Sequence, residues 1–287
     1  MGNWDFDGDE AIFFLASAAV MIFGACGWYL WLARPTRLGE RGPQRLLLGV
    51  TPLVALLGLW FVLMTWADPK YVVGNLDYQL LFTAGGGAWL VVVAGLTKLL
   101  GVSVRDDAIE RRNLAAAVMV SGGALGVMCI YAACNVGSGP TIWTTIFPAA
   151  VATVAWLVLW LIVELFTRTS EAITIERDLA TGIRAAAFLL AAGLVLGRAM
   201  AGDWTSWEST FSEFRRLAWP AGLLAAIAIV AHIIFRPTAA QPRPAPVGSG
   251  MIPAAVLLAL ALGYVISLGP ADIGKHVITY EEYTGHK

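Results

Sequence analysis

The chain has 287 residues, of which 58% are hydrophobic and 14% charged, and its formal net charge is −1. Its mean hydropathy of +0.72 lies outside the range of soluble globular domains. This composition excludes a water-soluble globular protein and predicts an integral membrane protein. The near-zero net charge gives no reason to expect a polyanionic partner such as a nucleic acid.

The hydrophobic residues cluster in eight runs of about 20 residues, the length that a helix needs to cross a hydrocarbon core of about 30 Å. The runs are apolar on every face, which favours helices over the alternating strands of a membrane barrel. We therefore predict an all-α, polytopic transmembrane bundle. The expected spans are Ala11–Ala33, Leu46–Trp66, Tyr78–Leu100, Leu114–Cys134, Ile142–Phe166, Ile183–Met200, Leu217–Phe235 and Met251–Leu268.

Basic residues are distributed unevenly between the two sides of these spans. If the N-terminus is outside, thirteen lysines and arginines fall in the inner connections and five in the outer segments. The positive-inside rule then places both termini on the outer side of a bacterial inner membrane. The first ten residues carry four acidic and no basic side chains, which argues against a cleavable signal peptide.

Two junctions in the sequence resemble each other. "AIERRNLAAAVMVSGGALG" at residues 108–126 is echoed by "AITIERDLATGIRAAAFLLAAGLVLG" at 172–197, with Ile109 and Ile175 separated by 66 positions. Arg111 and Arg177 then act as equivalent retention charges on the inner side. "WTTIF" at 143–147 matches "WESTF" at 207–211 with an offset of 64.

These echoes predict tandem two-helix units that share one orientation and are related by an axis along the membrane normal. The organisation we expect has three parts. Residues 1–105 hold the first three helices, 106–238 the tandem core with helices four to seven, and 239–287 a Pro-rich linker, the last helix and an outer tail.

The tandem pattern resembles a known family. "IERRNLAAAVMVSGGALG" and "IERDLATGIRAAAFLLAAG" open the two units, "GRAMAGDW" closes one helix, and the likeness covers about Asp106 to Thr238. It is similar to the bacterial membrane family catalogued as domain of unknown function 350. That resemblance implies tandem two-helix units without recognisable catalytic residues, and it implies no activity.

Charged residues within the spans are candidates for a polar pathway, because a charge at mid-membrane is costly. Glu164 lies four residues before Arg168, and His232 lies four before Arg236. Two interpretations stay open: Glu164 and His232 form a titratable pair lining an inner vestibule, or both extend to the lipid headgroups. Lys98 is expected to pair with Glu164 across the units.

Arg198 and Asp203 at the outer end of the sixth span, and Arg184 at its inner end, carry a similar pair of interpretations. A basic ring there would select anions. Alternatively, each arginine ends the span and pairs with a carboxylate or a lipid phosphate.

Glycines give a clearer physical signal. Gly122 and Gly126, like Gly193 and Gly197, have the small-xxx-small spacing that lets helix backbones approach closely in lipid. We predict that the fourth and sixth helices pack through these glycines, either within one chain or between subunits. "AGGGA" at 84–88 lacks the following lysine of a phosphate-binding loop.

The remaining residue types do not form a reactive centre in the sequence. Cys26, Cys129 and Cys134 fall within spans without metal-binding spacing, so we expect them to pack. Most tryptophans lie near span ends, as interfacial anchors do, although the outer loops could instead form an aromatic cage. We expect no metal, no cofactor and no enzymatic activity.

Two functions therefore remain open: a small channel or transporter-like bundle, and an oligomerising scaffold or accessory subunit of a membrane complex. The expected partners are the lipid bilayer and either further copies of the chain or a membrane complex. A polar, water-wide cavity beside Glu164 would favour transport. A solidly packed interior with an exposed apolar groove would favour the scaffold.

Overall fold

The computed structural model describes residues 6–34, 42–96, 101–236, 246–271 and 273. These residues form helices and no strand, and eight of the helices are long and apolar enough to cross a membrane. The chain is an all-α, multi-pass membrane protein, as predicted. The helices are α1 (Gly8–Ala33), α2 (Pro43–Thr65), α3 (Leu76–Leu96), the short π-helix η2 (Val104–Glu110), α4 (Leu114–Ala133), α5 (Trp143–Thr167), the short α6 (Thr169–Thr174), α7 (Leu179–Arg198), α8 (Trp207–Phe235) and α9 (Val247–Ser267).

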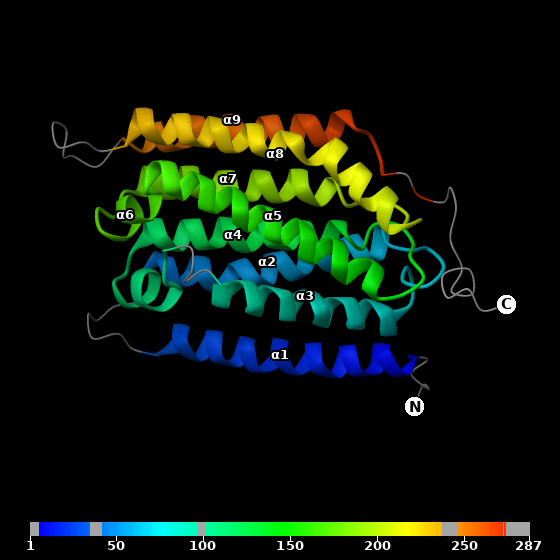
Figure 1. Ribbon diagram of the computed structural model, residues 1–287. Helices are drawn as coiled ribbons and strands as arrows, with labels where there is room; N and C mark the ends of the chain where they lie inside the picture. Colours follow the sequence, from blue (N-terminus) through cyan, green and yellow to red (C-terminus); the bar gives the residue numbers. More distant parts are fainter. Residues whose placement is uncertain (1–5, 35–41, 97–100, 237–245, 272, 274–287) are drawn as a thin grey trace.

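Four parallel helices form a row through the bundle in the order α2, α4, α7, α9, each packed against the next. The other four long helices run in the opposite direction; among them α1 packs on α3, and α5 packs on α8. The end of the bundle that holds η2 and α6 is called the arginine-rich end below. The end at which α1 begins and α9 ends is called the terminal end (Figure 1).

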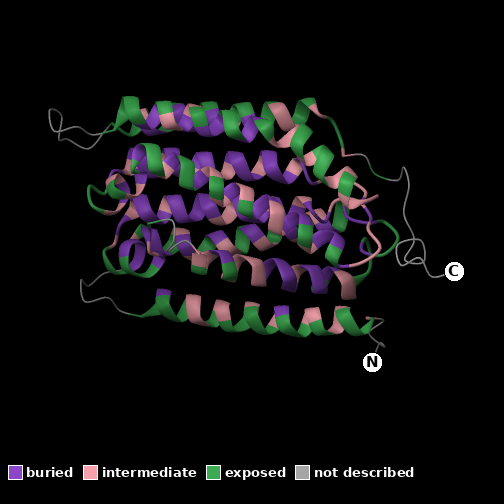
Figure 2. Ribbon diagram, in the orientation of Figure 1, coloured by how far each residue is buried: buried purple, intermediate pink, exposed green. Residues whose placement is uncertain are grey.

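The centre of the row consists of α4 and α7, which are largely buried along their whole length (Figure 2). Their sequences are dominated by Ala and Gly, and small side chains let two helices approach closely where lipid supplies no hydrophobic drive for association. In contrast, α1 and the edges of α2 and α9 expose large apolar side chains, as a lipid-facing surface requires. Examples are Ile12, Leu15, Phe23, Leu46, Leu57, Met251, Ile252 and Ile266.

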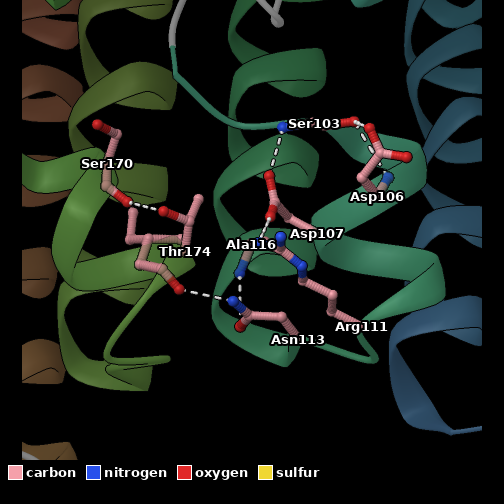
Figure 3. Close-up of polar contacts among 9 residues, drawn as sticks. Ser103, Asp106, Asp107, Arg111, Asn113, Ala116, Ser170 and Thr174 are labelled. Atoms are coloured by element: carbon pink, nitrogen blue, oxygen red, sulfur yellow. Dashed lines mark hydrogen bonds and ion pairs between the residues drawn. The ribbon is translucent and has the colours of Figure 1, made fainter.

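The two central helices begin in the same way. Asn113 caps α4 by accepting from the N–H groups of Ala115 and Ala116, and Asp178 caps α7 by accepting from the N–H of Thr181. A side-chain oxygen at this position satisfies N–H groups that have no partner within the helix. The Asn113 amide also donates to a main-chain carbonyl at the end of α6, 2.6 Å away, so the start of α4 is joined to the end of α6 (Figure 3).

An arginine in the left-handed backbone region precedes each cap, Arg112 with φ 57° and Arg177 with φ 58°. These two residues are 65 positions apart, and so are the caps Asn113 and Asp178. The sequence register of 66 is therefore shifted by one residue: the structure sets Arg112, not Arg111, at the position of Arg177. Matching the two Ile-Glu-Arg segments gives an offset of 66. The left-handed arginine and the cap that follows it recur after 65 residues, because the left-handed conformation is tied to the cap and not to the Ile-Glu-Arg residues.

The same spacing recurs at the terminal end, where Gly137 and Gly202 both have positive φ values. The loops that follow α2, α4 and α7 lie side by side there and exchange main-chain hydrogen bonds, which hold the ends of three parallel helices together. Gly137 N–H donates to Trp66, Gly202 N–H to Val136 and Trp204 N–H to Ser138.

Prolines inside the helices create further contacts between neighbours. Proline lacks an N–H, so the carbonyl four residues earlier loses its helical donor and the adjacent hydrogen bonds weaken. In two helices, a side chain from another helix donates to such a carbonyl: Trp28 to Leu48 before Pro52, and Arg184 to Ser249 before Pro253. Tyr29 donates to Gly49 and Tyr264 to Leu217, and these carbonyls lie three residues before Pro52 and Pro220, next to the one that lacks a donor.

Some predicted boundaries were wrong. Helix α8 begins at Trp207 and not at Leu217, and α7 begins at Leu179 and not at Ile183. The first turns of α8 carry polar side chains that a hydropathy run omits, but Ser206 and Ser209 form a reciprocal cap that starts the helix. The short elements η2 and α6 were not predicted, because their polar sequences read as loops.

Candidate functional site

A cluster of polar side chains lies buried between α7, α8 and α9 near the arginine-rich end. Arg184 and Asp178 are each 1% exposed and His232 is 2% exposed. The guanidinium donates from Nε to His232 Nδ1 at 3.3 Å and from Nη2 to Thr181 Oγ1 at 2.7 Å. Its Nη2 also lies 3.9 Å from Asp178 Oδ2, so the buried positive charge has a buried counter-charge.

The sequence places these side chains together for a simple reason. Asp178 is the cap of α7, and Thr181 and Arg184 follow at intervals of three residues, so all three share one face of the helix. Arg184 lies ~9 Å along the axis from Asp178 at 1.5 Å per residue. Charged side chains at such depth are rare in membrane helices and mark candidate functional sites.

The cluster leaves two polar atoms unsatisfied. Because Nδ1 of His232 accepts from Arg184, that nitrogen carries no proton, and the proton of the neutral ring is assigned to Nε2. Within the described part of the chain, neither His232 Nε2 nor Asp178 Oδ1 has a hydrogen-bond partner. Buried polar atoms without partners are uncommon, and here both belong to ionisable groups in contact with Arg184.

Arg184 also reaches α9. Its Nη1 donates to the main-chain carbonyl of Ser249 at 3.0 Å. This carbonyl lacks a helical donor because residue 253, one turn later, is a proline. The single guanidinium therefore joins α7 to α8 through His232 and to α9 through Ser249.

Glu164 lies in the last turn of α5, at the arginine-rich end, and contacts Ser170. Its carboxylate accepts from the N–H of Ser170 at 2.9 Å and from the Ser170 hydroxyl, while Arg168 approaches Glu171 at 4.0 Å. The Glu164 carboxylate thus satisfies a main-chain N–H in the first turn of α6. Lys98 lies outside the described residues, so its pairing with Glu164 stays a prediction.

His232 does not extend to the headgroups. It is almost fully buried against Arg184, so the interpretation that it reaches the interface beside Arg236 was wrong. The structure does not bring Glu164 and His232 into one contact, because the first lies on Ser170 and the second on Arg184.

Arg198 and Asp203 at the terminal end also take other partners. Arg198 is half-buried and donates to the carbonyls of Gly269 and Pro270, which follow α9. The carboxylate of Asp203 accepts from the N–H of Ser138 at 2.8 Å, across the two loops. Arg198 therefore holds the end of α9 in place, which is a structural contact and not part of a basic ring.

The four predicted packing glycines lie between α4 and α7 within one chain. A Cβ added at Gly126 would lie 2.4 Å from the carbonyl oxygen of Leu189, and one at Gly193 would lie 2.3 Å from that of Gly126. Gly122 and Gly197 meet the backbone of the facing helix at 2.5 Å and 2.8 Å. The two helices are thus in backbone contact over several turns.

A small polar cavity lies at the terminal end, between the loops after α4 and α7 and the first turns of α5 and α8. Its volume is about 40 Å³, enough for a few water molecules. Its lining includes the carboxylates of Asp203 and Glu213 and the hydroxyls of Thr144 and Thr210. This cavity is at the opposite end of the bundle from Glu164.

The aromatic residues of the terminal end pack on one another. Trp207 lies edge-on to Phe147, with ring centroids 4.7 Å apart, and to Trp204 at 5.2 Å. Such edge-to-face contacts fill the space that an aromatic cage would leave open. Cys26 is exposed, Cys129 is half-buried and Cys134 is buried. Among the described residues, no group of three or more His, Cys, Asp or Glu side chains could hold a metal ion.

Comparisons with family models, curated proteins and solved structures find no match to this chain. The resemblance to the family of domain of unknown function 350 therefore stays a prediction. The class of protein is defined by the fold alone: an all-α protein with eight helices of membrane-spanning length and a buried ionic cluster in its second half.

Sequence reasoning named Arg184 and His232 but did not bring them together. The two residues are 48 positions apart in different helices, and no local pattern predicts their contact. One signal was available: Asp178, Thr181 and Arg184 recur every three residues, which places three polar side chains on one face of an otherwise apolar helix.

Proposed function

We propose that this protein is a non-catalytic membrane scaffold, an accessory subunit that assembles with other membrane proteins. The observation that carries the proposal is the backbone contact between α4 and α7, because it leaves no room for a pathway between the two central helices. Transport would need a water-wide cavity beside Glu164, whereas the cavity described above lies at the terminal end.

The surface supports the same proposal. Helix α1 is buried over only 6% of its most apolar stretch, and α2 and α9 over 28% each. These helices form the edges of the bundle and offer long apolar faces to lipid or to another membrane protein. Since the glycines of α4 and α7 are used within the chain, assembly would involve the edge helices instead.

The test is photocrosslinking in native membranes. A photoreactive residue replaces Ile12 on α1 or Ile252 on α9, each 69% exposed, and Leu189, which is 1% exposed, serves as the matched internal position. We expect discrete adducts larger than the chain from an exposed position and none from Leu189. A chain that stays monomeric in native membranes and conducts ions in liposomes would contradict the proposal.

A second candidate, gated transport of a proton or small ion, is favoured by one observation, the buried cluster of Asp178, Arg184 and His232. Flux in proteoliposomes would test it, with Asp178→Asn as the variant and Glu110→Ala, in an exposed pair, as the control. Flux that is lost only in Asp178→Asn would support transport. Flux that persists in Asp178→Asn, or that is absent from the parent and both variants, would contradict transport.

We further propose that the chain lies in a bacterial inner membrane with both termini outside, on the basis of its arginine-rich connections. In support of the orientation, Arg34, Arg112, Arg177 and Arg236 all lie at one end of the bundle, and α1 begins and α9 ends at the other. A tag at either terminus should react with an impermeant reagent in intact cells; protection of both tags would contradict this orientation.

The tandem-unit organisation and the kinship to domain of unknown function 350 belong to the same proposal. They are supported by main-chain geometry that recurs after 65 residues, in Arg112 and Arg177 and in Gly137 and Gly202. Expression of α4–α5 and α7–α8 as separate fragments tests the units. The two fragments should associate in the membrane, because α4 of one and α7 of the other are in backbone contact.

A further inference from the structure

The first turns of α9 expose one face and pack the other against α7. Val247, Met251 and Ile252 are 47%, 59% and 69% exposed. On the other face, Gly250 meets the backbone of Ala180, and a Cβ added there would lie 2.7 Å from it. The polar contact that the structure gives between this end of α9 and α7 is the one from Arg184 to the Ser249 carbonyl.

The opposite end of α9 is held differently. The Tyr264 hydroxyl donates to the Leu217 carbonyl at 2.9 Å, and Arg198 donates to the two carbonyls after the helix. These contacts are independent of Arg184. Pro253 lies between the two ends, one turn after Ser249, and a proline inside a helix is a common site of bending.

From these contacts we infer that the arginine-rich end of α9 is a movable lid over the buried cluster, held closed by a latch between Arg184 and the Ser249 carbonyl that Pro253 leaves without a donor. Opening the latch exposes the guanidinium, with its partners Asp178 and His232, at the arginine-rich end. The terminal end of α9 stays in place, and Pro253 is the hinge. This conformational device is independent of the scaffold function.

The latch uses Pro253 and Arg184 as a matched pair. Without the proline, the N–H of residue 253 would donate to Ser249, and the helix would need no external donor. Without the arginine, the carbonyl would lie partly buried and unsatisfied, which is costly in an apolar environment. The effects of replacing Arg184 and Pro253 on the closed position of α9 should therefore depend on each other.

Met119 supplies an internal reference. It lies 65 positions before Arg184 and occupies the corresponding place in α4, where it is 3% exposed. A methionine is therefore a side chain that this fold already accommodates at that level of a central helix. Arg184→Met removes the latch with a residue of similar length, and Pro253→Ala restores the main-chain donor.

The test measures distances between spin labels in a chain whose three cysteines are replaced. One pair, on Arg177 and Val247, reports on the latched end, and a control pair, on Glu208 and Ile266, reports on the terminal end. All four positions are exposed. We expect narrow distributions for both pairs in the parent protein.

In Arg184→Met, the Arg177–Val247 distribution should broaden and shift to longer distances, with the open population rising by about tenfold, while the control pair stays narrow. Adding Pro253→Ala should return the first distribution to its narrow form. If Arg184→Met does not accumulate as folded protein, the same comparison is made in an Asp178→Asn background, which removes the buried carboxylate charge that Arg184→Met would leave without its counter-charge.

Three other results would overturn the proposal. The Arg177–Val247 distribution could stay narrow in Arg184→Met, which would show that the latch is dispensable. Pro253→Ala could fail to restore it, which would show that the Ser249 carbonyl is not the reason for the contact. Both pairs could broaden together, which would show that Arg184 supports the whole bundle and not one end of α9.

Discussion

Trp28 of α1 donates its indole N–H to the carbonyl of Leu48 in α2, at 3.2 Å. This carbonyl is the one that Pro52 leaves without a helical donor. The neighbouring Tyr29 donates to the next carbonyl, that of Gly49, at 2.9 Å. A proline in one membrane helix thus becomes a polar docking point for another, and it joins α1 to α2 in addition to the packing of α1 on α3.

Trp28→Phe should lower the free energy of unfolding by about 1 kcal/mol, because it removes one hydrogen bond and keeps the aromatic volume. In a Pro52→Ala background the same change should have a smaller effect, since residue 52 then supplies an N–H to Leu48. Unfolding of the four proteins in detergent gives the coupling between the two sites. Equal losses in both backgrounds would contradict the proposed docking.

Gly126→Ala should destabilise the protein by about 1–3 kcal/mol, because its Cβ would lie 2.4 Å from a main-chain oxygen of α7 that cannot move aside. Gly263→Ala in α9 is the matched control: no atom lies within 4 Å of the added Cβ. Alanine there should leave the protein as stable or more stable, because it has the higher helix propensity. Similar thermal midpoints for the two variants would contradict the α4–α7 backbone contact.

Gly85→Ala should destabilise the junction of α3 and α4, because the new Cβ would lie 2.3 Å from the hydroxyl oxygen of Tyr131. Tyr131→Phe removes this oxygen and loses one hydrogen bond, to the Phe82 carbonyl. The double variant should therefore be more stable than Gly85→Ala alone. If the second substitution makes the first worse, the close contact between these residues is not the cause of the loss.

Asp178→Ala should cost about 3–5 kcal/mol, because it leaves the Arg184 charge buried without its counter-charge and removes the cap of α7. Glu110→Ala is the comparison, since Glu110 pairs with Arg105 where both side chains are more than half exposed. That change should cost less than about 1 kcal/mol. Unfolding of both variants in the same detergent measures the difference, and comparable losses would show that burial of the Asp178 pair does not matter.

Much of the architecture could be predicted from hydropathy and spacing. The eight apolar runs correspond to the eight long helices, and all of their centres were located, because a helix must satisfy its own main-chain groups in lipid and must be apolar enough to stay there. The four glycines named from the sequence lie at the α4–α7 contact. The polar first turns of α8 escaped this reasoning, since hydropathy does not detect a helix that begins in the interface.

The residues of the candidate site illustrate the limit of that reasoning. Glu164 and His232 were paired because each precedes an arginine by four residues, yet each side chain turns to a different partner, Ser170 or Arg184. A sequence interval gives positions on one helix, but a buried side chain takes the partner that the neighbouring helix offers.

The sequence alone determined that this chain crosses a membrane as a bundle of helices, where the crossings lie, and that small residues would line a helix contact. These properties follow from the length, polarity and size of consecutive side chains. Only the tertiary structure decided that the contact joins α4 to α7 within one chain, that carbonyls which a proline leaves without a helical donor accept from other helices, and that Arg184 meets His232. The reason is physical: in lipid, main-chain carbonyls and charges must find partners wherever packing brings one, and that packing depends on residues far apart in the chain.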